Sequence, residues 1–257
     1  MWVGQKNNYF QTTEHRFNYM FASIFSGKKA SSVLAVALFS LAALNFSSCK
    51  KEDKIDPSQS GKIELHFDNR AGALDLVLNN AQPYTTANGQ EITITEFNYY
   101  ISNVKFHNAD GSTHTVPQAE SYFLIKESDF TTQEIEFAIP EGDYTGVSFT
   151  VGVDSARSAM DISQRTGVLD PAAGGQGMYW SWNSGYIFLK LEGTSPQAPL
   201  DSATNQRPVM YHIGGFGGYS SPTINNLKTV RIEFGQNVEV RDEDHDHGDD
   251  HGHRHSH

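Results

Sequence analysis

Residues 135–153 have the sequence IEFAIPEGDYTGVSFTVGV. In the first half, apolar side chains occupy every second position until Pro140 ends the run. A polar Glu-Gly-Asp turn follows, and the alternation resumes from Val147 to Val153. Because successive side chains of a strand point to opposite faces, this pattern predicts two half-buried β-strands separated by a turn.

The same two-residue period recurs on both sides of this stretch. Alternating apolar runs begin at Ile63, Leu74, Ile92, Ile187 and Val230, and Gly, Pro or Asn residues bound them. Short runs of this kind are typical of an antiparallel sandwich or barrel, and no long helical period follows the N-terminal leader. We therefore predict a mainly β fold, an antiparallel β-sandwich that spans residues 62–240.

One stretch of the predicted domain, residues 154–185, breaks the alternation. It is rich in Gly, Ser and Asp, and it contains Trp180 and Trp182. Insertions much longer than an ordinary hairpin loop are usually functional or disordered, and the aromatic content argues against disorder. We therefore expect a long functional loop here.

The N-terminal region has the pattern of an export signal. Lys28 and Lys29 precede the apolar run VLAVALFSLAALNF at 33–46, which ends in small residues before Cys49. The run is too short to span a bilayer as a permanent helix, and a basic region, an apolar region and a small-residue site form a secretory signal. Residues 1–48 are therefore interpreted as a signal peptide. Met20 is an alternative start to Met1.

Cys49 lies where a bacterial lipobox carries its lipidated cysteine. We expect a lipid anchor on Cys49, a solvated tether over 49–61, and a location in the cell envelope on the outer membrane, periplasmic or surface-exposed. The alternative is a short membrane anchor with an incidental cysteine. The charged segment KKEDK at 50–54 resembles the surface-export signal of Bacteroidetes lipoproteins.

Composition limits the classes of partner. The formal charge of −11 argues against a nucleic-acid partner and suits cations. Since Cys49 is the single cysteine, a transition metal would be held by His, carboxylate, Met or backbone oxygen. The sequence contains no G-x-S-x-G elbow, P-loop or H-E-x-x-H motif, so we do not expect an enzyme.

The C-terminal segment 241–257, RDEDHDHGDDHGHRHSH, is the most specific feature for metal chemistry. Its histidines are His245, His247, His251, His253, His255 and His257. Neutral imidazole binds copper, zinc and nickel, and His-rich tracts do so without a fold. We predict a disordered tail that binds several copper or other divalent ions loosely. The alternative is a solvated tail with pH-dependent charge.

Four histidines lie within the predicted domain. His212 alternates with apolar neighbours and precedes two glycines that allow close backbone approach. A lone strand histidine is more often structural than a ligand. His66 falls on the polar face of its strand, and we expect His107 and His114 to be solvated loop residues beside the turn at Asp110 and Gly111.

Several segments in this order carry a family resemblance. They are NYYISNV at 98–104, GVDS at 152–155, GVLDP at 167–171, MYWSWNSGY at 178–186 and HIGG at 212–215. The region from about 62 to 236 resembles the MbnP-like family, named after a copper-binding partner protein of methanobactin systems. The W-x-W-x-x-G-Y and H-I-G-G elements are the specific parts.

This resemblance implies a periplasmic or surface β-sandwich that binds copper. It implies His212 and, less directly, His66 as ligands. It also implies Trp180 or Trp182 as a residue that a MauG-like di-haem partner oxidises to kynurenine. The alternative for these tryptophans is core packing beside Tyr186. Alternative functions are a glycan-binding module, with an aromatic platform of Trp180, Trp182 and Tyr186, and a structural lipoprotein without a ligand.

Overall fold

The computed structural model describes residues 2–4, 55–180 and 185–242. Residues 5–48 of the predicted signal region, Cys49, Trp182 and the tail histidines lie outside these ranges. Among the described residues, no helix has the length and apolarity needed to cross a membrane. The description below concerns the unit that contains the β-rich domain.

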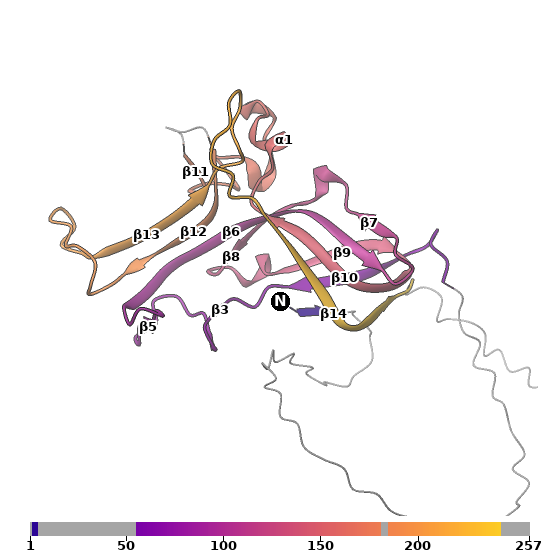
Figure 1. Cartoon of the computed structure of the whole chain (residues 1–257), viewed down its shortest axis with the longest axis horizontal. Coiled ribbons are helices and arrows are strands. Elements are labelled where there is room, and N and C mark those ends of the chain that lie inside the picture. The colour runs from indigo at the N-terminus through magenta and orange to yellow at the C-terminus, as the bar shows by residue number, and fades with distance from the viewer. Residues whose placement is uncertain (1, 5–54, 181–184, 243–257) are drawn as a thin grey trace, which may run out of the picture. The chain divides into compact units, whose positions relative to one another are not determined.

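The domain is built almost entirely of antiparallel strands (Figure 1). The strands are β1 (Trp2–Gly4), β2 (Ser60–His66), β3 (Arg70–Ala71), β4 (Leu74–Asp75), β5 (Tyr84–Thr85), β6 (Glu91–Asn108), β7 (Thr113–Thr115), β8 (Tyr122–Lys126), β9 (Glu134–Pro140), β10 (Gly142–Val151), β11 (Tyr179–Trp180), β12 (Gly185–Thr194), β13 (Pro208–Gly214) and β14 (Lys228–Val240). The predicted mainly β fold is confirmed.

β6 is the central strand of the larger sheet, and its 18 residues pair with five other strands. Along one edge it pairs first with β12, over Thr93–Tyr99, and then with β10, over Ile101–Asn108. Along the other edge it pairs with β5, β8 and β7 in turn. Figure 1 shows β5 and β7 at opposite ends of β6. Beyond these neighbours, β13 pairs with β12 and β14 pairs with β10.

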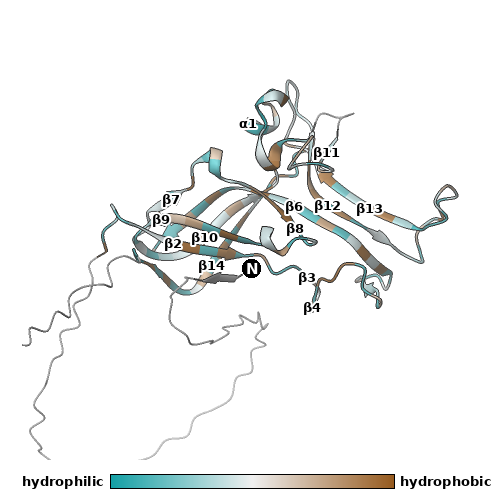
Figure 2. Cartoon of the chain, turned by 180° about the vertical axis from the view of Figure 1, so that it is seen from behind, coloured by the Kyte–Doolittle hydropathy of each residue, from teal (hydrophilic) through white to brown (hydrophobic). Residues whose placement is uncertain are grey.

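A second sheet, formed by β2 and β9 with β1, packs against the larger one. Alternate residues of β2 and β9 are buried, as the period-two pattern predicts. They meet inward side chains of β6 and β10 in one apolar core that includes Leu65, Ile101, Phe106, Ile139 and Val147, all 1% exposed or less. Figure 2 shows apolar residues spaced along these strands. Burial of such side chains drives the two sheets together.

The stretch 135–153 connects the two layers of the sandwich. β9 pairs with β2, whereas β10 pairs with β6 and β14, so the chain passes from one sheet to the other at Glu141. The turn predicted from Glu-Gly-Asp is therefore a crossover between sheets.

Residues 154–178 fold over the opposite face of β6 and β12 as short helical turns: α1 (Ser155–Ser158), η3 (Ile162–Gln164) and η4 (Gly167–Leu169). Beneath them lies a second apolar cluster that includes Tyr100, Met178, Tyr186 and Phe188. The hydroxyl of Tyr100 donates to Val168 O at 2.7 Å, and that of Tyr186 donates to Leu169 O at 2.6 Å. These bonds fix the long loop to the sheet.

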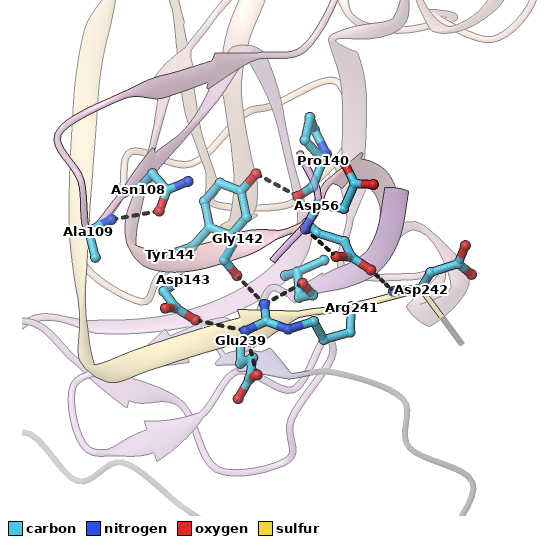
Figure 3. Close-up of polar contacts among 12 residues, drawn as sticks. Asp56, Asn108, Ala109, Pro140, Gly142, Asp143, Tyr144, Glu239, Arg241 and Asp242 are labelled. Atoms are coloured by element: carbon cyan, nitrogen blue, oxygen red, sulfur yellow. Dashed lines mark hydrogen bonds and ion pairs between the residues drawn. The ribbon is translucent and has the colours of Figure 1, made fainter. Parts of the chain in front are cut away.

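Both ends of the domain meet at one buried carboxylate (Figure 3). Glu141, which is 6% exposed, accepts hydrogen bonds from the backbone N–H groups of Asp56 and Asp242, each at 2.9 Å. These bonds lower the pKa of Glu141. Gly61 lies so close to Arg241 that a Cβ at Gly61 would come within 2.1 Å of the Arg241 carbonyl oxygen. The tether therefore enters the domain where β14 leaves it.

The region around Leu74 differs from its prediction as an alternating strand. Leu76 is buried, but Leu74 is 64% exposed, and β3 and β4 form a ladder of only two residue pairs. Leu76 instead packs with Tyr84 and Ile94 in a small cluster at the start of β6.

Candidate functional site

His212 lies on a sheet face that β6, β12 and β13 form together. In β13 it is paired with Lys190 of β12, which in turn is paired with Asn98 of β6. The adjacent row on the same face consists of Met210, Glu192 and Glu96. Register therefore gathers side chains that are more than 100 positions apart in the sequence.

Five of these side chains form a connected polar network, which comprises Glu96, Asn98, Lys190, Glu192 and His212. Nε2 of His212 lies 2.8 Å from Oε1 of Glu192, and Lys190 Nζ lies 3.3 Å from the same oxygen. Lys190 also pairs with Oε2 of Glu96 at 2.8 Å, and Asn98 Nδ2 donates to Oε1 of Glu96 at 2.6 Å. Asn98 is buried, and its Oδ1 atom has no hydrogen-bond partner among the described residues.

Electrostatics keep the central pair of the network charged. Burial alone would raise the pKa of Glu192, but the hydrogen bond with His212 and the charge of Lys190 lower it. For Lys190, burial alone would lower the pKa, but Glu96 and Glu192 raise it. At neutral pH the network therefore holds an ammonium between two carboxylates.

The long loop reaches the edge of this network. A Cβ at Gly177 would lie 3.8 Å from Lys190 Nζ. The indole of Trp180 lies over Gly214, where a Cβ would come within 2.7 Å of Cζ3. Because Gly214 and His212 are two positions apart in one strand, they share a face. His212 therefore lies between Trp180 on one side and Met210 on the other.

Trp180 is partly buried against the second apolar cluster, in agreement with the core-packing alternative. Tyr186 is only 1% exposed, and its hydroxyl is bound to Leu169. The alternative of an aromatic glycan-binding platform is therefore wrong for Tyr186, because this residue is buried in the core. Trp182 lies outside the described residues.

The second predicted ligand, His66, lies in a different sheet from His212. It ends β2, is half-buried, and places Nδ1 3.5 Å from Oε1 of Glu134 in β9. The structure thus does not bring the two histidines into one network. Among the described residues, no three His, Cys, Asp or Glu side chains are grouped to hold a metal ion.

The prediction that His107 and His114 are solvated loop residues is wrong. Both belong to paired strands, His107 in β6 and His114 in β7, and both are half-buried. Nε2 of His107 lies 2.8 Å from Ser148 Oγ, and burial is the main cause that lowers the pKa of each histidine. The hairpin turn is shorter than expected, so its flanking positions extend the ladder.

Sequence reasoning missed Glu96, Lys190 and Glu192. Lys190 and Glu192 are the polar alternates of a strand whose other face is apolar, and Glu96 comes before the Asn98 motif. Polar alternates usually face solvent, and only the pairing of β12 with β6 and β13 shows that they meet at His212.

Comparison with known proteins agrees with this architecture. The MbnP family model matches residues 60–248. The solved structure of MbnP from Methylosinus trichosporium matches with a TM-score of 0.50 at 17% sequence identity, over 69% of this chain and 72% of that one. No curated protein matches. Since the family model covers most of the chain, the protein belongs to the MbnP family.

Proposed function

We propose that the protein is an exported lipoprotein that binds copper, for its acquisition, storage or handling, and that it is not itself an enzyme. The observation that carries the proposal is His212, held by Glu192 between Trp180 and Met210 in a member of the MbnP family. A copper-related role is what this family membership suggests, and the donor set around His212 fits it.

The contact with Glu192 selects the nitrogen of His212 that would bind the metal. An ionised carboxylate only accepts hydrogen bonds, so in a neutral His212 the proton is on Nε2, and this N–H donates a hydrogen bond to Glu192. The lone pair is then on Nδ1, which is the nitrogen available to a metal. A carboxylate behind a ligating histidine fixes its tautomer and orientation and makes it a stronger donor.

Met210 would add a second donor of suitable chemistry. Two positions before His212 in β13, it shares the face of His212, and it is 63% exposed. A thioether is a soft ligand and, with imidazole, favours Cu(I). We propose His212 and Met210 as protein ligands and Glu192 as a positioning residue, while His66 stays a more distant candidate.

The rest of the proposal concerns segments outside the described residues. A lipid on Cys49 would anchor the protein to a membrane of the cell envelope, on the periplasmic or the outer side. The six tail histidines would bind further copper or other divalent ions loosely. Because Glu141 holds Asp56 and Asp242 together, the tether and the tail would begin side by side.

We also propose that Trp180 or Trp182 is oxidised by a MauG-like di-haem partner. The position of the Trp180 ring over Gly214, two residues from His212, supports this, because a modified indole would then border the copper ligand. Mass spectrometry of protein from the native host would report the modified residue, the bound metal and the lipid on Cys49 together. Unmodified tryptophans would refute the oxidation step.

The copper site is tested by titration of the mature chain with Cu(I) in competition with a chromophoric chelator. The six tail histidines are replaced by serine so that only the domain site is measured. We expect stoichiometric binding that His212→Ala weakens by at least about tenfold, and a smaller loss for Met210→Leu.

His114→Ala is the matched control, because His114 is a half-buried histidine of β7 that is paired with Phe106, near the end of β6 away from the network. It should leave the affinity unchanged. His66→Ala decides whether the second histidine contributes. If the domain binds no copper, or if His212→Ala behaves like the control, the domain site is refuted and only the tail can bind metal.

A further inference from the structure

The outer face of the sandwich carries a groove of about 450 Å³ that is separate from the His212 network. It crosses β7, β6, β10 and β14, and its lining side chains are polar apart from Val116, which belongs to the apolar core. Its lining includes Lys105, Thr115, Ser148, Thr150 and Thr229. A volume of this size accommodates a small organic molecule.

The strand register concentrates polar groups here. Lys105 is paired directly with Thr115 on one side and Ser148 on the other, and Thr150 is paired with Thr229. Directly opposed side chains lie about 5 Å apart at Cβ, close enough to bind one ligand together. The groove therefore presents an ammonium flanked by hydroxyl groups that both donate and accept hydrogen bonds.

Within the described part of the chain, no carboxylate forms an ion pair with Lys105. The nearby Arg231 is paired with Glu233 instead. For a chain of formal charge −11, an uncompensated cation among hydroxyl groups is distinctive. The pKa of the neighbouring His107 is lowered first by burial, then by the charge of Arg231 and, more weakly, by that of Lys105, while Glu233 raises it.

The carboxylate of Asp154, which contacts two residues of the groove lining, already has hydrogen-bond partners. Its Oδ2 atom accepts from Asn103 Nδ2 at 2.7 Å, Tyr122 OH at 2.8 Å and Gln118 Nε2 at 3.2 Å. Asn103 and Gln118 line the groove, and with their amide nitrogens committed to Asp154 they retain carbonyl oxygens as acceptors. Those acceptors suit hydroxyl groups on a ligand rather than a second anion.

We propose that this groove binds a small carboxylate that carries hydroxyl groups, of the acidic-sugar class. Lys105 would pair with the carboxylate. The hydroxyl groups of Thr115, Ser148 and Thr150, with the Gln118 carbonyl, would bind the ligand hydroxyls. This site is independent of copper.

The proposal is tested by calorimetric titration of the metal-free mature chain with glucuronate, acetate and glucose. Glucuronate combines the charge and the hydroxyl groups, whereas acetate and glucose carry one feature each. We expect glucuronate to bind with a Kd on the order of 1 mM or tighter and the other two to bind at least about tenfold more weakly. Equal binding of acetate or glucose, or no binding of glucuronate, overturns the proposal.

Two variants tie the binding to the groove. Lys105→Gln removes the charge from an exposed side chain and should weaken glucuronate binding by about tenfold. Thr150→Val removes one hydroxyl at nearly constant shape and should weaken it less. The control Lys62→Gln makes the same charge change in the other sheet and should leave it unchanged. A loss in Lys105→Gln no larger than in Lys62→Gln overturns the assignment.

Discussion

Nε2 of His212 and Oε1 of Glu192 lie 2.8 Å apart, joined across neighbouring strands of the larger sheet. The same oxygen lies 3.3 Å from Lys190 Nζ. The hydrogen bond with His212 and the charge of Lys190 lower the pKa of Glu192 against the effect of burial, and the ionised carboxylate accepts the N–H of a neutral His212 at Nε2. The contact with Glu192 thus leaves Nδ1 of a neutral His212 as the nitrogen with a free lone pair.

Glu192→Gln should weaken copper binding without removing a ligand. The neutral amide can donate as well as accept, so it no longer fixes the tautomer of His212. We expect a loss of about tenfold or more in Cu(I) affinity, measured by chelator competition with the tail histidines replaced.

The control for this variant is Glu91→Gln, an exposed glutamate at the start of β6. It changes the net charge equally and should not alter the affinity. An equal effect of the two substitutions would mean that Glu192 acts only through overall charge.

Gly214→Ala should displace Trp180 and destabilise the domain. A Cβ at this position would come within 2.4 Å of Tyr186 O and 2.7 Å of Trp180 Cζ3, so the indole or the strand must move. We expect a loss of about 1–3 kcal/mol in the free energy of unfolding in urea. In the mature chain from Cys49, which lacks Trp2, a Trp182→Phe background should show a shifted Trp180 fluorescence maximum.

Gly72→Ala is the control for Gly214→Ala, because it adds backbone strain without steric crowding. Gly72 has a φ of +67° with nothing near its missing Cβ, so alanine there costs strain alone. It should leave the fluorescence unchanged. If the fluorescence maximum of Trp180 does not shift in Gly214→Ala, the placement of the Trp180 ring over Gly214 in β13 is contradicted.

The sequence was sufficient to predict the mainly β fold, because each sandwich strand buries one face and alternates accordingly. The length of β6 was not predictable from alternation. Around its centre Tyr99 and Ile101 are buried in the sandwich core, while Tyr100 is buried in the cluster on the opposite face. A strand covered on both faces loses its period-two pattern.

The candidate site was predictable only in part. His212 was identified through the family resemblance, and one of the two glycines noted after it, Gly214, does allow close approach of Trp180. The partners of His212 come from β6 and β12, and their meeting depends on register, which a single sequence does not specify. For the same reason sequence alone could not show that His66 lies in the other sheet.

Glu141→Gln should loosen both ends of the domain. The ionised carboxylate accepts from the N–H groups of Asp56 and Asp242, and hydrogen bonds to a charged group stabilise more than neutral ones. We expect a loss of about 2 kcal/mol in unfolding free energy at pH 7. Amide exchange at Asp56 and Asp242 should become faster, while Glu91→Gln should change neither.

The effect should depend on pH with a definite sign. The pKa of Glu141 in the folded protein lies below the ordinary value of 4.5. The contribution of its hydrogen bonds to the free energy of unfolding is therefore fully present above pH 4.5. The contribution is lost as the pH falls through the folded pKa. The difference between wild type and Glu141→Gln should therefore shrink when urea unfolding is repeated near pH 3. A difference that persists in acid would show that the amide fails for steric reasons.

Asp154→Ala should be the more damaging of two helix-cap substitutions. Asp154 caps α1 by accepting from Arg157 N at 3.1 Å, and its second oxygen accepts from Asn103 and Tyr122. Asn103 has a φ of +54°, in the left-handed region that few residues other than glycine and asparagine adopt, and this contact helps to hold it. We expect a loss of about 3 kcal/mol in unfolding free energy.

Asp161→Ala is the matched comparison, since Asp161 is the exposed N-cap of η3. Its side-chain oxygen Oδ1 accepts hydrogen bonds from the backbone N–H and the hydroxyl of Ser163. Its loss should be clearly smaller. The network of Asp154 also borders the Lys105 groove, so Asp154→Ala should free Gln118 and alter glucuronate binding, whereas Asp161→Ala should not. Equal losses of unfolding free energy in the two variants would show that Asp154 acts only as a helix cap and does not connect the long loop to the groove.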